Sequence, residues 1–251
     1  MSQYHLEDKS SRKLLGGPHY RESIWELLRK KSARNYLEIG VRDGETLIGA
    51  TCESVGIDPY FAFTCNPVGA KRSLQLFQIT SDEFFRDFDV QEILRDNIDF
   101  AFIDGMHLFE YILRDFINVE RCCDRNSVIL LDDCLPVNIE MTERTHRPEA
   151  RADRAVADWW TGDVWKILDV IREYRPELRV TPVDVQPTGS IIISNVDPES
   201  TILYEEYFNI LDKYLNIELT EERFEKYWAQ NKPVSGKEIL REFEFTQFLR
   251  P

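Results

Sequence analysis

Several features that mark particular classes of protein are scarce or missing in this sequence. Its five cysteines are odd in number and form no C-x-x-C pair, which argues against a disulfide framework and against a structural zinc site. No apolar run approaches the roughly 20 residues of a membrane-spanning helix. Acidic residues outnumber basic ones by 45 to 31, so we expect no basic surface for nucleic acid or for an anionic membrane.

The start of the chain also lacks the basic and apolar stretches of a secretory signal peptide. Free thiols are the usual state of cysteine in a reducing compartment. Both observations predict a cytoplasmic protein.

What the sequence does contain is an alternation of apolar runs and helical patterns. Residues 35–40, 54–58, 74–79, 100–104 and 128–132 are predicted as strands, most of them ending in a turn or in acid. This alternation predicts an α/β fold with a doubly wound, mostly parallel sheet. Two further strands, 178–185 and 190–195, are expected to form an antiparallel hairpin.

The chain divides into three predicted parts. Residues 1–33 form a polar, loosely ordered segment and a first helix, residues 34–196 form the α/β domain, and residues 197–251 form a helical C-terminal extension. Within the domain, the long polar stretch 134–162 contains clustered arginines and the pair Trp159-Trp160. Its length predicts a functional lid loop. Asp163 is expected to cap the helix that follows it.

Two of the predicted strands end in acid. Phe100 to Ile103 stops at Asp104, and Val128 to Leu131 stops at Asp132 and Asp133. A right-handed crossover makes these strands parallel, so both ends lie at the edge where open α/β sheets bind their ligands. His107 follows Asp104 after about one helical turn and is expected to join the three carboxylates there.

The turn after the first strand, Glu38-Ile39-Gly40-Val41-Arg42-Asp43-Gly44, points to a small-molecule ligand. Its glycines allow a ligand to approach the backbone, and Asp58 ends the second strand where an acid commonly accepts the ribose hydroxyls of an adenosine cofactor. The third glycine of the dinucleotide fingerprint is missing. The acids of this turn would repel a pyrophosphate but suit a cationic ligand such as S-adenosylmethionine.

These motifs resemble those of class I S-adenosylmethionine-dependent methyltransferases. Residues 36–46 are similar to their motif I. The stretch 102–107, with Tyr111, Asp115 and the double aspartate, is similar to the metal-dependent O-methyltransferases related to macrolide-sugar methyltransferases and cephalosporin-hydroxylase-like proteins (methyltransferase family 24-like). The resemblance spans residues 34–196 and implies a Rossmann-like sheet of seven strands.

The resemblance also implies roles for individual residues. Cofactor contacts are expected at Glu38, Gly40, Gly44, Asp58, Ser81 and Asp104. A divalent metal such as Mg²⁺ is expected at Asp104, Asp132 and Asp133, with His107 as the base and Asp104 beside it in catalysis.

Methyl transfer to oxygen suits this set of residues. A hard cation lowers the pKa of a bound hydroxyl, and an imidazole can accept its proton near neutral pH. The predicted reaction is therefore O-methylation of a sugar, glycan or small natural product, with no nucleic acid or membrane partner and with homo-oligomerisation open. The alternatives are a phenol or catechol acceptor, a nucleotide-sugar or NAD-dependent oxidoreductase on the same fold, and a module without catalysis.

Overall fold

The computed structural model describes residues 12–242, so residues 1–11 and 243–251 of the predicted N-terminal segment and C-terminal extension lie outside the described part. Within it, eight strands form one sheet in the order β3-β2-β1-β4-β5-β7-β6-β8. The strands are β1 (Asn35–Ile39), β2 (Glu53–Ile57), β3 (Leu74–Phe77), β4 (Ile98–Ile103), β5 (Cys123–Leu131), β6 (Arg179–Asp184), β7 (Ser190–Ser194) and β8 (Val234–Ser235).

The strand directions confirm the predicted fold class. β1 to β5 run parallel, and β7 lies antiparallel between β5 and β6. The sheet has one strand more than the seven expected, because the two-residue β8 of the C-terminal extension pairs with β6.

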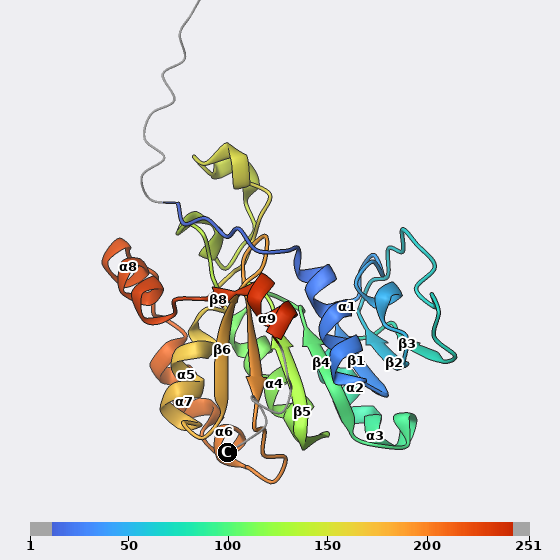
Figure 1. The fold of residues 1–251 in the computed structure, drawn as a ribbon. Helices are drawn as coiled ribbons and strands as arrows, with labels where there is room; N and C mark the ends of the chain where they lie inside the picture. The colour runs from blue at the N-terminus through green and yellow to red at the C-terminus, as the bar shows by residue number, and fades with distance from the viewer. Residues whose placement is uncertain (1–11, 243–251) are drawn as a thin grey trace, which may run out of the picture.

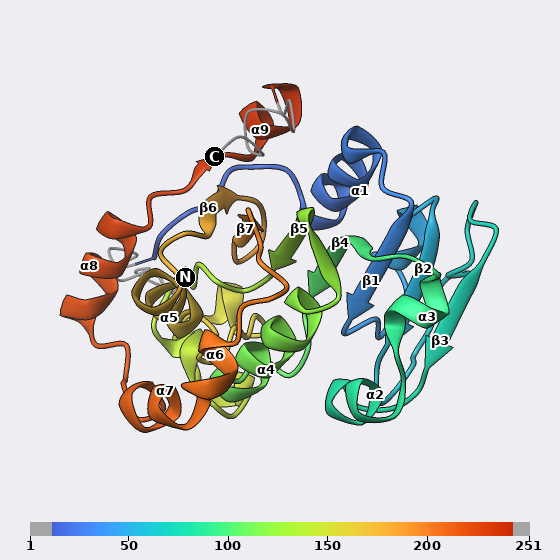
Figure 2. The ribbon, with the colours of Figure 1, turned by 90° about the horizontal axis from the view of Figure 1, so that it is seen from below.

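Helices cover both faces of the sheet (Figures 1 and 2). Helices α1 (Tyr20–Lys31) and α9 (Gly236–Glu242) lie on one face, and α2 (Ser81–Asp87), α4 (Phe109–Glu120), α6 (Ile202–Glu205) and α7 (Tyr207–Tyr214) lie on the other. The remaining helices are α3 (Val90–Leu94), α5 (Lys166–Tyr174) and α8 (Glu221–Gln230). No helix between residues 12 and 242 combines the length and apolarity that crossing a membrane requires.

The continuous apolar strands follow from this layering. Successive side chains of a strand point to opposite faces, and in β1 Leu37 and Ile39 join the core beneath α4 whereas Tyr36 joins the core beneath α1. A strand covered on both faces needs apolar residues at nearly every position. Apart from Glu38, which is buried inside β1, the acids of the candidate site therefore stand just beyond the ends of the strands, at the edge of the sheet.

Side-chain contacts define two turns that border the site. After β1 the chain forms one 3-10 turn, Leu47–Gly49; the indole of Trp25 packs where a side chain on Gly49 would stand and donates to the carbonyl of Thr46 at 2.8 Å. The cap of α2 is Thr80, which forms a reciprocal capping box with Glu83.

The segment between β5 and α5, which we call the wall segment, is folded and is not an open loop. It contains three 3-10 turns, Glu140–Thr142, Pro148–Ala150 and Arg154–Val156. Val137, Met141 and Val156 form a small apolar cluster of their own, which Leu15 of the N-terminal segment joins. Figure 1 shows this segment (yellow-green) standing above the sheet, with the N-terminal trace (blue) beside it. The described part of the N-terminal segment is thus packed in place and not loosely ordered.

Candidate active site

A cleft of about 810 Å³ opens at the carboxyl ends of the parallel strands. Its volume lies in the range of small-molecule sites. Of the residues predicted to form a site, seven line it: Gly40, Asp58, Ser81, Asp104, His107, Asp132 and Asp133. The wall segment adds His146, Asp158, Trp159 and Trp160, and helix α1 adds Tyr20 and Arg21.

Asp104, His107 and Asp133 meet in what we call the Asp–His cluster. Nε2 of His107 lies 3.2 Å from Oδ1 of Asp104, and Nδ1 lies 2.8 Å from Oδ2 of Asp133. Thr188 donates to the other oxygen of Asp133. The imidazole therefore bridges two carboxylates that come from neighbouring strands.

The backbone is bent to make this contact. His107 and Asp133 have φ values of 37° and 60°, in the left-handed region that residues with a Cβ rarely adopt. Such strained residues concentrate at functional sites. Gly162 permits the approach of the wall segment, because a Cβ there would lie 1.7 Å from the carbonyl oxygen of His107.

Asp132 lies beside the Asp–His cluster but faces another partner. Its Oδ1 accepts a hydrogen bond from Ser190 of β7 at 2.5 Å, and its side chain is buried. Burial raises the pKa of Asp132 well above its ordinary value, and the carboxylates of Asp104 and Asp133 raise it further. The structure thus brings Asp104, Asp133 and His107 into contact and sets Asp132 next to them.

Trp160 fixes the imidazole from the wall segment. Its carbonyl oxygen lies 2.6 Å from Nδ1 of His107, and its ring stacks on the imidazole at 5.1 Å with an angle of 14° between the planes. His146 also stacks on the indole, at 5.5 Å with 10° between the planes. Trp159, which is 38% exposed, also lines the cleft and can offer an indole face to a ligand.

The charge of the Asp–His cluster suits a divalent cation. Burial alone would lower the pKa of His107, but the carboxylates of Asp133 and Asp104 outweigh it and hold that pKa well above its usual range. Burial raises the pKa of Asp104. One ligand atom from each of the three residues lies within 4.8 Å of the others. Carboxylate oxygens suit Mg²⁺ and Mn²⁺, and an imidazole nitrogen suits Zn²⁺.

The opposite end of the cleft has the features of a nucleoside site. Both oxygens of Asp58 accept backbone hydrogen bonds, from Arg42 at 2.8 Å and from Tyr60 at 2.7 Å, so the carboxylate is held in one orientation. Each oxygen keeps a further lone pair for a ligand. Gly40 has φ 91°, and a Cβ there would lie 1.8 Å from the carbonyl oxygen of Asp104.

Two residues that were predicted to contact the cofactor, Glu38 and Gly44, do not line the cleft. Glu38 is fully buried, and its Oε2 accepts a hydrogen bond from Tyr36 at 2.7 Å, while Oε1 has no hydrogen-bond partner in the described part of the chain. Burial raises the pKa of Glu38 to about 8. Gly44 supports the turn at φ 79° but does not line the cleft.

Helix α1 contributes two residues that were not predicted to belong to the site, Tyr20 and Arg21. Arg21 pairs with Asp43 at 3.0 Å and also with Glu45. The acids of the glycine turn, which we expected to attract a cationic ligand, are therefore already paired with a guanidinium. Tyr20 stacks on Phe102 at 5.8 Å and lies near Asp104 and Asp132.

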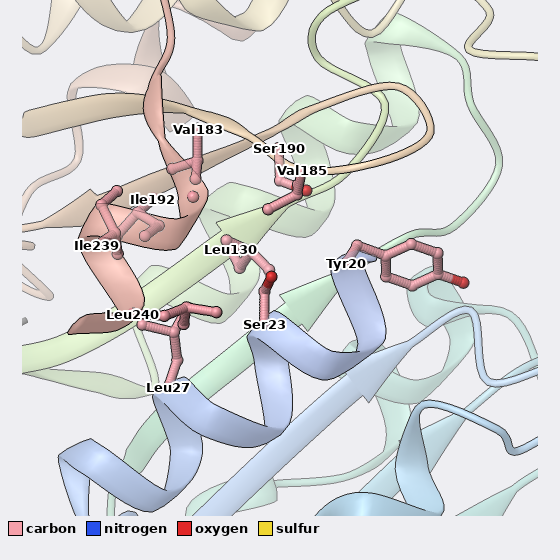
Figure 3. A pocket seen from close by; sticks show the side chains of 11 residues that line it. Tyr20, Ser23, Leu27, Leu130, Val183, Val185, Ser190, Ile192, Ile239 and Leu240 are labelled. Carbon is pink, nitrogen blue, oxygen red and sulfur yellow. The ribbon is translucent and has the colours of Figure 1, made fainter. Parts of the chain in front are cut away.

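A second cavity, shown in Figure 3, lies between α1, α9 and the sheet. Its volume of about 10 Å³ corresponds to at most one water molecule, and its lining is mostly apolar. Tyr20 borders both cavities, and its ring points away from the other labelled side chains in Figure 3. This small cavity is a packing gap, and the large cleft is the candidate site.

The chain is similar to known proteins over part of its length. Residues 31–134 match a family model described as a methyltransferase domain. Among curated proteins, none matches the sequence.

The solved structures to which this chain is similar include three methyltransferases of low sequence identity. Methyltransferase PaMTH1 of Podospora anserina, bound to S-adenosylhomocysteine, has a TM-score of 0.48 and 15% identity over 71% of this chain and 78% of that chain. The O-methyltransferase TomG of Streptomyces achromogenes, involved in tomaymycin synthesis, has a TM-score of 0.49 and 16% identity over 73% and 82%. An O-methyltransferase from Bacillus cereus has a TM-score of 0.46 and 16% identity over 69% and 79%.

Proposed function

We propose that the chain transfers a methyl group from S-adenosylmethionine to a hydroxyl with the help of a divalent cation, and the match of residues 31–134 to the model of a methyltransferase domain supports this proposal. The position of the Asp–His cluster in the same cleft as Asp58 carries this proposal. One end of the cleft suits the nucleoside of the donor, and the other offers groups that can bind and deprotonate an alcohol.

At the donor end of the cleft, the residues of the chain would bind and orient S-adenosylmethionine. Asp58 would accept the ribose hydroxyls, since its carboxylate is already fixed by two backbone N–H groups. Gly40 leaves room for the amino acid part to pass close to the backbone. Methyl transfer is an in-line displacement, so holding the sulfonium still against the attacking oxygen lowers the entropic part of the barrier.

At the acceptor end, Asp104 and Asp133 would hold the cation, with Asp132 beside them. A divalent cation bound there would lower the pKa of a coordinated hydroxyl. His107 accepts the hydroxyl proton at a ring nitrogen. The carboxylates of Asp104 and Asp133 raise the pKa of this imidazole and favour its protonated form. His107 can therefore act as a base only when a bound cation offsets the negative charge of these carboxylates.

We propose a sugar, a glycan or a glycosylated natural product as the acceptor, with two neighbouring hydroxyls to meet the cation. The exposed face of Trp159 in the cleft supports this choice, because an indole face suits the apolar face of a sugar ring. A catechol would satisfy the same two-oxygen requirement and is the second candidate. Assays with paired glycoside and catechol acceptors distinguish them.

Cofactor titrations test the donor assignment. We expect S-adenosylhomocysteine to bind in the micromolar range and NAD not to bind. Tight binding of NAD alone would favour the oxidoreductase alternative and contradict the proposal.

Metal removal tests the role of the Asp–His cluster. Methyl transfer should fall by at least about 100-fold in chelator and return with Mg²⁺ or Mn²⁺. Asp104→Asn and Asp133→Asn should lose this metal response while still binding S-adenosylhomocysteine. Asp212→Asn, a change of an exposed aspartate on α7, serves as the charge-matched control. Full activity in chelator without added metal would disprove the metal role.

We also retain two broader proposals. The absence of a basic excess supports a small-molecule or glycan partner and not nucleic acid. Five free cysteines support a reducing, cytoplasmic location.

A further inference from the structure

The hydroxyl of Tyr227, in helix α8 of the C-terminal extension, connects the two ends of the wall segment. It donates a hydrogen bond to the carbonyl oxygen of Cys134 at 2.7 Å and lies 3.2 Å from the carbonyl oxygen of Trp165. The phenol ring is buried and packs edge-on against the indole of Trp165, with 5.5 Å between the ring centroids. Figures 1 and 2 show α8 beside α5, at the opposite end of the sheet from β3. A residue that does not line the cleft thus joins the two ends of its wall.

Other contacts bind the extension to the same two ends. The indole N–H of Trp228 donates to the carbonyl oxygen of Pro136 at 2.9 Å. Nζ of Lys166, which pairs with Asp163, also donates to the carbonyl oxygen of Leu215, the residue after α7, at 2.8 Å. Each end of the wall segment is therefore held by the extension.

These two ends adjoin the groups that hold His107. Cys134 directly follows Asp133, whose Oδ2 lies 2.8 Å from Nδ1 of His107. At the other end, Asp163 accepts a hydrogen bond at 2.8 Å from the backbone N–H of Phe109, two residues after His107. Because one end supplies Asp133 and the other fixes the chain just after His107, the relative position of the two ends sets the geometry of the Asp–His cluster.

We propose that Tyr227 is a positioning residue: by fixing the two ends of the wall segment against each other, it keeps Asp133 and His107 in the arrangement that binds the cation. The inference rests on the proposed cation site. Residues that orient metal ligands commonly change metal affinity or activity by roughly 10- to 100-fold when they are replaced. The C-terminal extension, which lies outside the matched methyltransferase domain, is then needed for the acceptor end of the cleft.

Mn²⁺ and S-adenosylhomocysteine, titrated separately in a calorimeter, test this role. Tyr227→Phe removes the hydroxyl and keeps the ring that packs on Trp165. Its affinity for Mn²⁺ should be about tenfold weaker than that of the wild-type protein, the low end of the range because Thr188 still bonds to Asp133. Its affinity for S-adenosylhomocysteine should be unchanged, because the turns after β1 and β2 form the donor end of the cleft.

Tyr214→Phe is the matched control. Tyr214 is also a buried tyrosine of the extension, in α7, but its hydroxyl donates to Glu173 of α5 at 2.7 Å and not to the wall segment. This variant loses a hydroxyl of the same kind and should bind Mn²⁺ like the wild-type protein. Equal weakening in both variants would assign the effect to general destabilisation and overturn the role of Tyr227.

Trp228→Phe provides a second variant in case Tyr227→Phe does not fold. It removes the donor to Pro136 from a half-buried position and should weaken Mn²⁺ binding in the same direction, by less than Tyr227→Phe does. Hydrogen exchange of peptides from residues 134–162 should be faster than in the wild-type protein in both variants and unchanged in Tyr214→Phe.

The outcomes separate this inference from the proposed function. Unchanged Mn²⁺ affinity in Tyr227→Phe, or in Trp228→Phe if the first variant does not fold, overturns the role of Tyr227 alone. Equal weakening of Mn²⁺ and S-adenosylhomocysteine binding in Tyr227→Phe also overturns it. Failure of the wild-type protein to bind Mn²⁺ overturns the cation site and the role of Tyr227 with it.

Discussion

The carbonyl oxygen of Trp160 lies 2.6 Å from Nδ1 of His107, and the indole of Trp160 stacks on the same imidazole. A segment 53 positions away in the sequence thus sets the plane of the proposed base. Nδ1 faces both this carbonyl and Asp133, whereas Nε2 faces Asp104. The wall segment therefore belongs to the catalytic arrangement as well as to the acceptor pocket.

Shortening Trp160 should slow methyl transfer without weakening donor binding. Trp160→Ala removes the stacking partner of His107, so we expect kcat to fall about tenfold or more while the Kd of S-adenosylhomocysteine is unchanged. Trp160→Phe keeps an aromatic face and should retain most of the rate. Steady-state kinetics and calorimetry measure the two quantities. Equal rates in the Ala and Phe variants would show that stacking does not orient the imidazole.

Replacing Asp163 should destabilise the fold. Its Oδ1 accepts from the backbone N–H of Phe109 at 2.8 Å, and its Oδ2 pairs with Lys166 at 2.7 Å, where both side chains are almost fully buried. Asp163→Ala leaves the ammonium group buried without this partner, so we expect a loss of about 3–5 kcal/mol in urea unfolding. Adding Lys166→Met should recover part of it. No recovery in the double variant would assign the loss to the missing cap of α4.

Glu38 should make stability depend on pH in a defined direction. Burial raises its pKa to about 8 in the folded protein, above its ordinary value of 4.5, so the folded state binds the proton more tightly. The stabilisation is complete below pH 4.5 and is lost as pH rises toward 8. Relative to Glu38→Gln, the wild-type protein should lose on the order of 3 kcal/mol between pH 5 and 8.

Unfolding free energies of both proteins across this range measure the effect. A constant difference in unfolding free energy between the wild-type protein and Glu38→Gln does not bear on this prediction. Only a difference between the two proteins in how the unfolding free energy changes with pH reports the proton on Glu38. Glu222→Gln, an exposed change on α8, should run parallel to wild type. Parallel curves for Glu38→Gln as well would show that Glu38 ionises normally.

The sheet and its acidic edge could be predicted because strong local patterns encode them. Apolar strands that stop at Asp58, Asp104 and Asp132 leave few topologies, and a right-handed crossover brings two of these ends together. The short spacing between Asp104 and His107 then accounts for their contact at 3.2 Å. These inferences needed only residues that are close in sequence or fixed by strand order.

Contacts made by irregular segments could not be predicted in this way. Asp163 was expected to cap α5, but its carboxylate lies at the start of α4, 54 positions earlier. Trp160 reaches His107 through a segment without periodicity, and the pairing of Arg21 with the glycine turn depends on how α1 docks. Each of these contacts joins elements whose relative position is set by packing, which a single sequence does not display.

The wall segment has a consequence for how this molecule can change. It leaves the sheet at Asp133, returns at Asp163, and buries Val137, Met141 and Val156 within itself. A segment with its own small core and two neighbouring attachment points can be replaced as a unit, while Asp58 and the glycine turn remain in the α/β domain. The range of acceptors could thus diverge among related chains faster than the handling of the methyl donor.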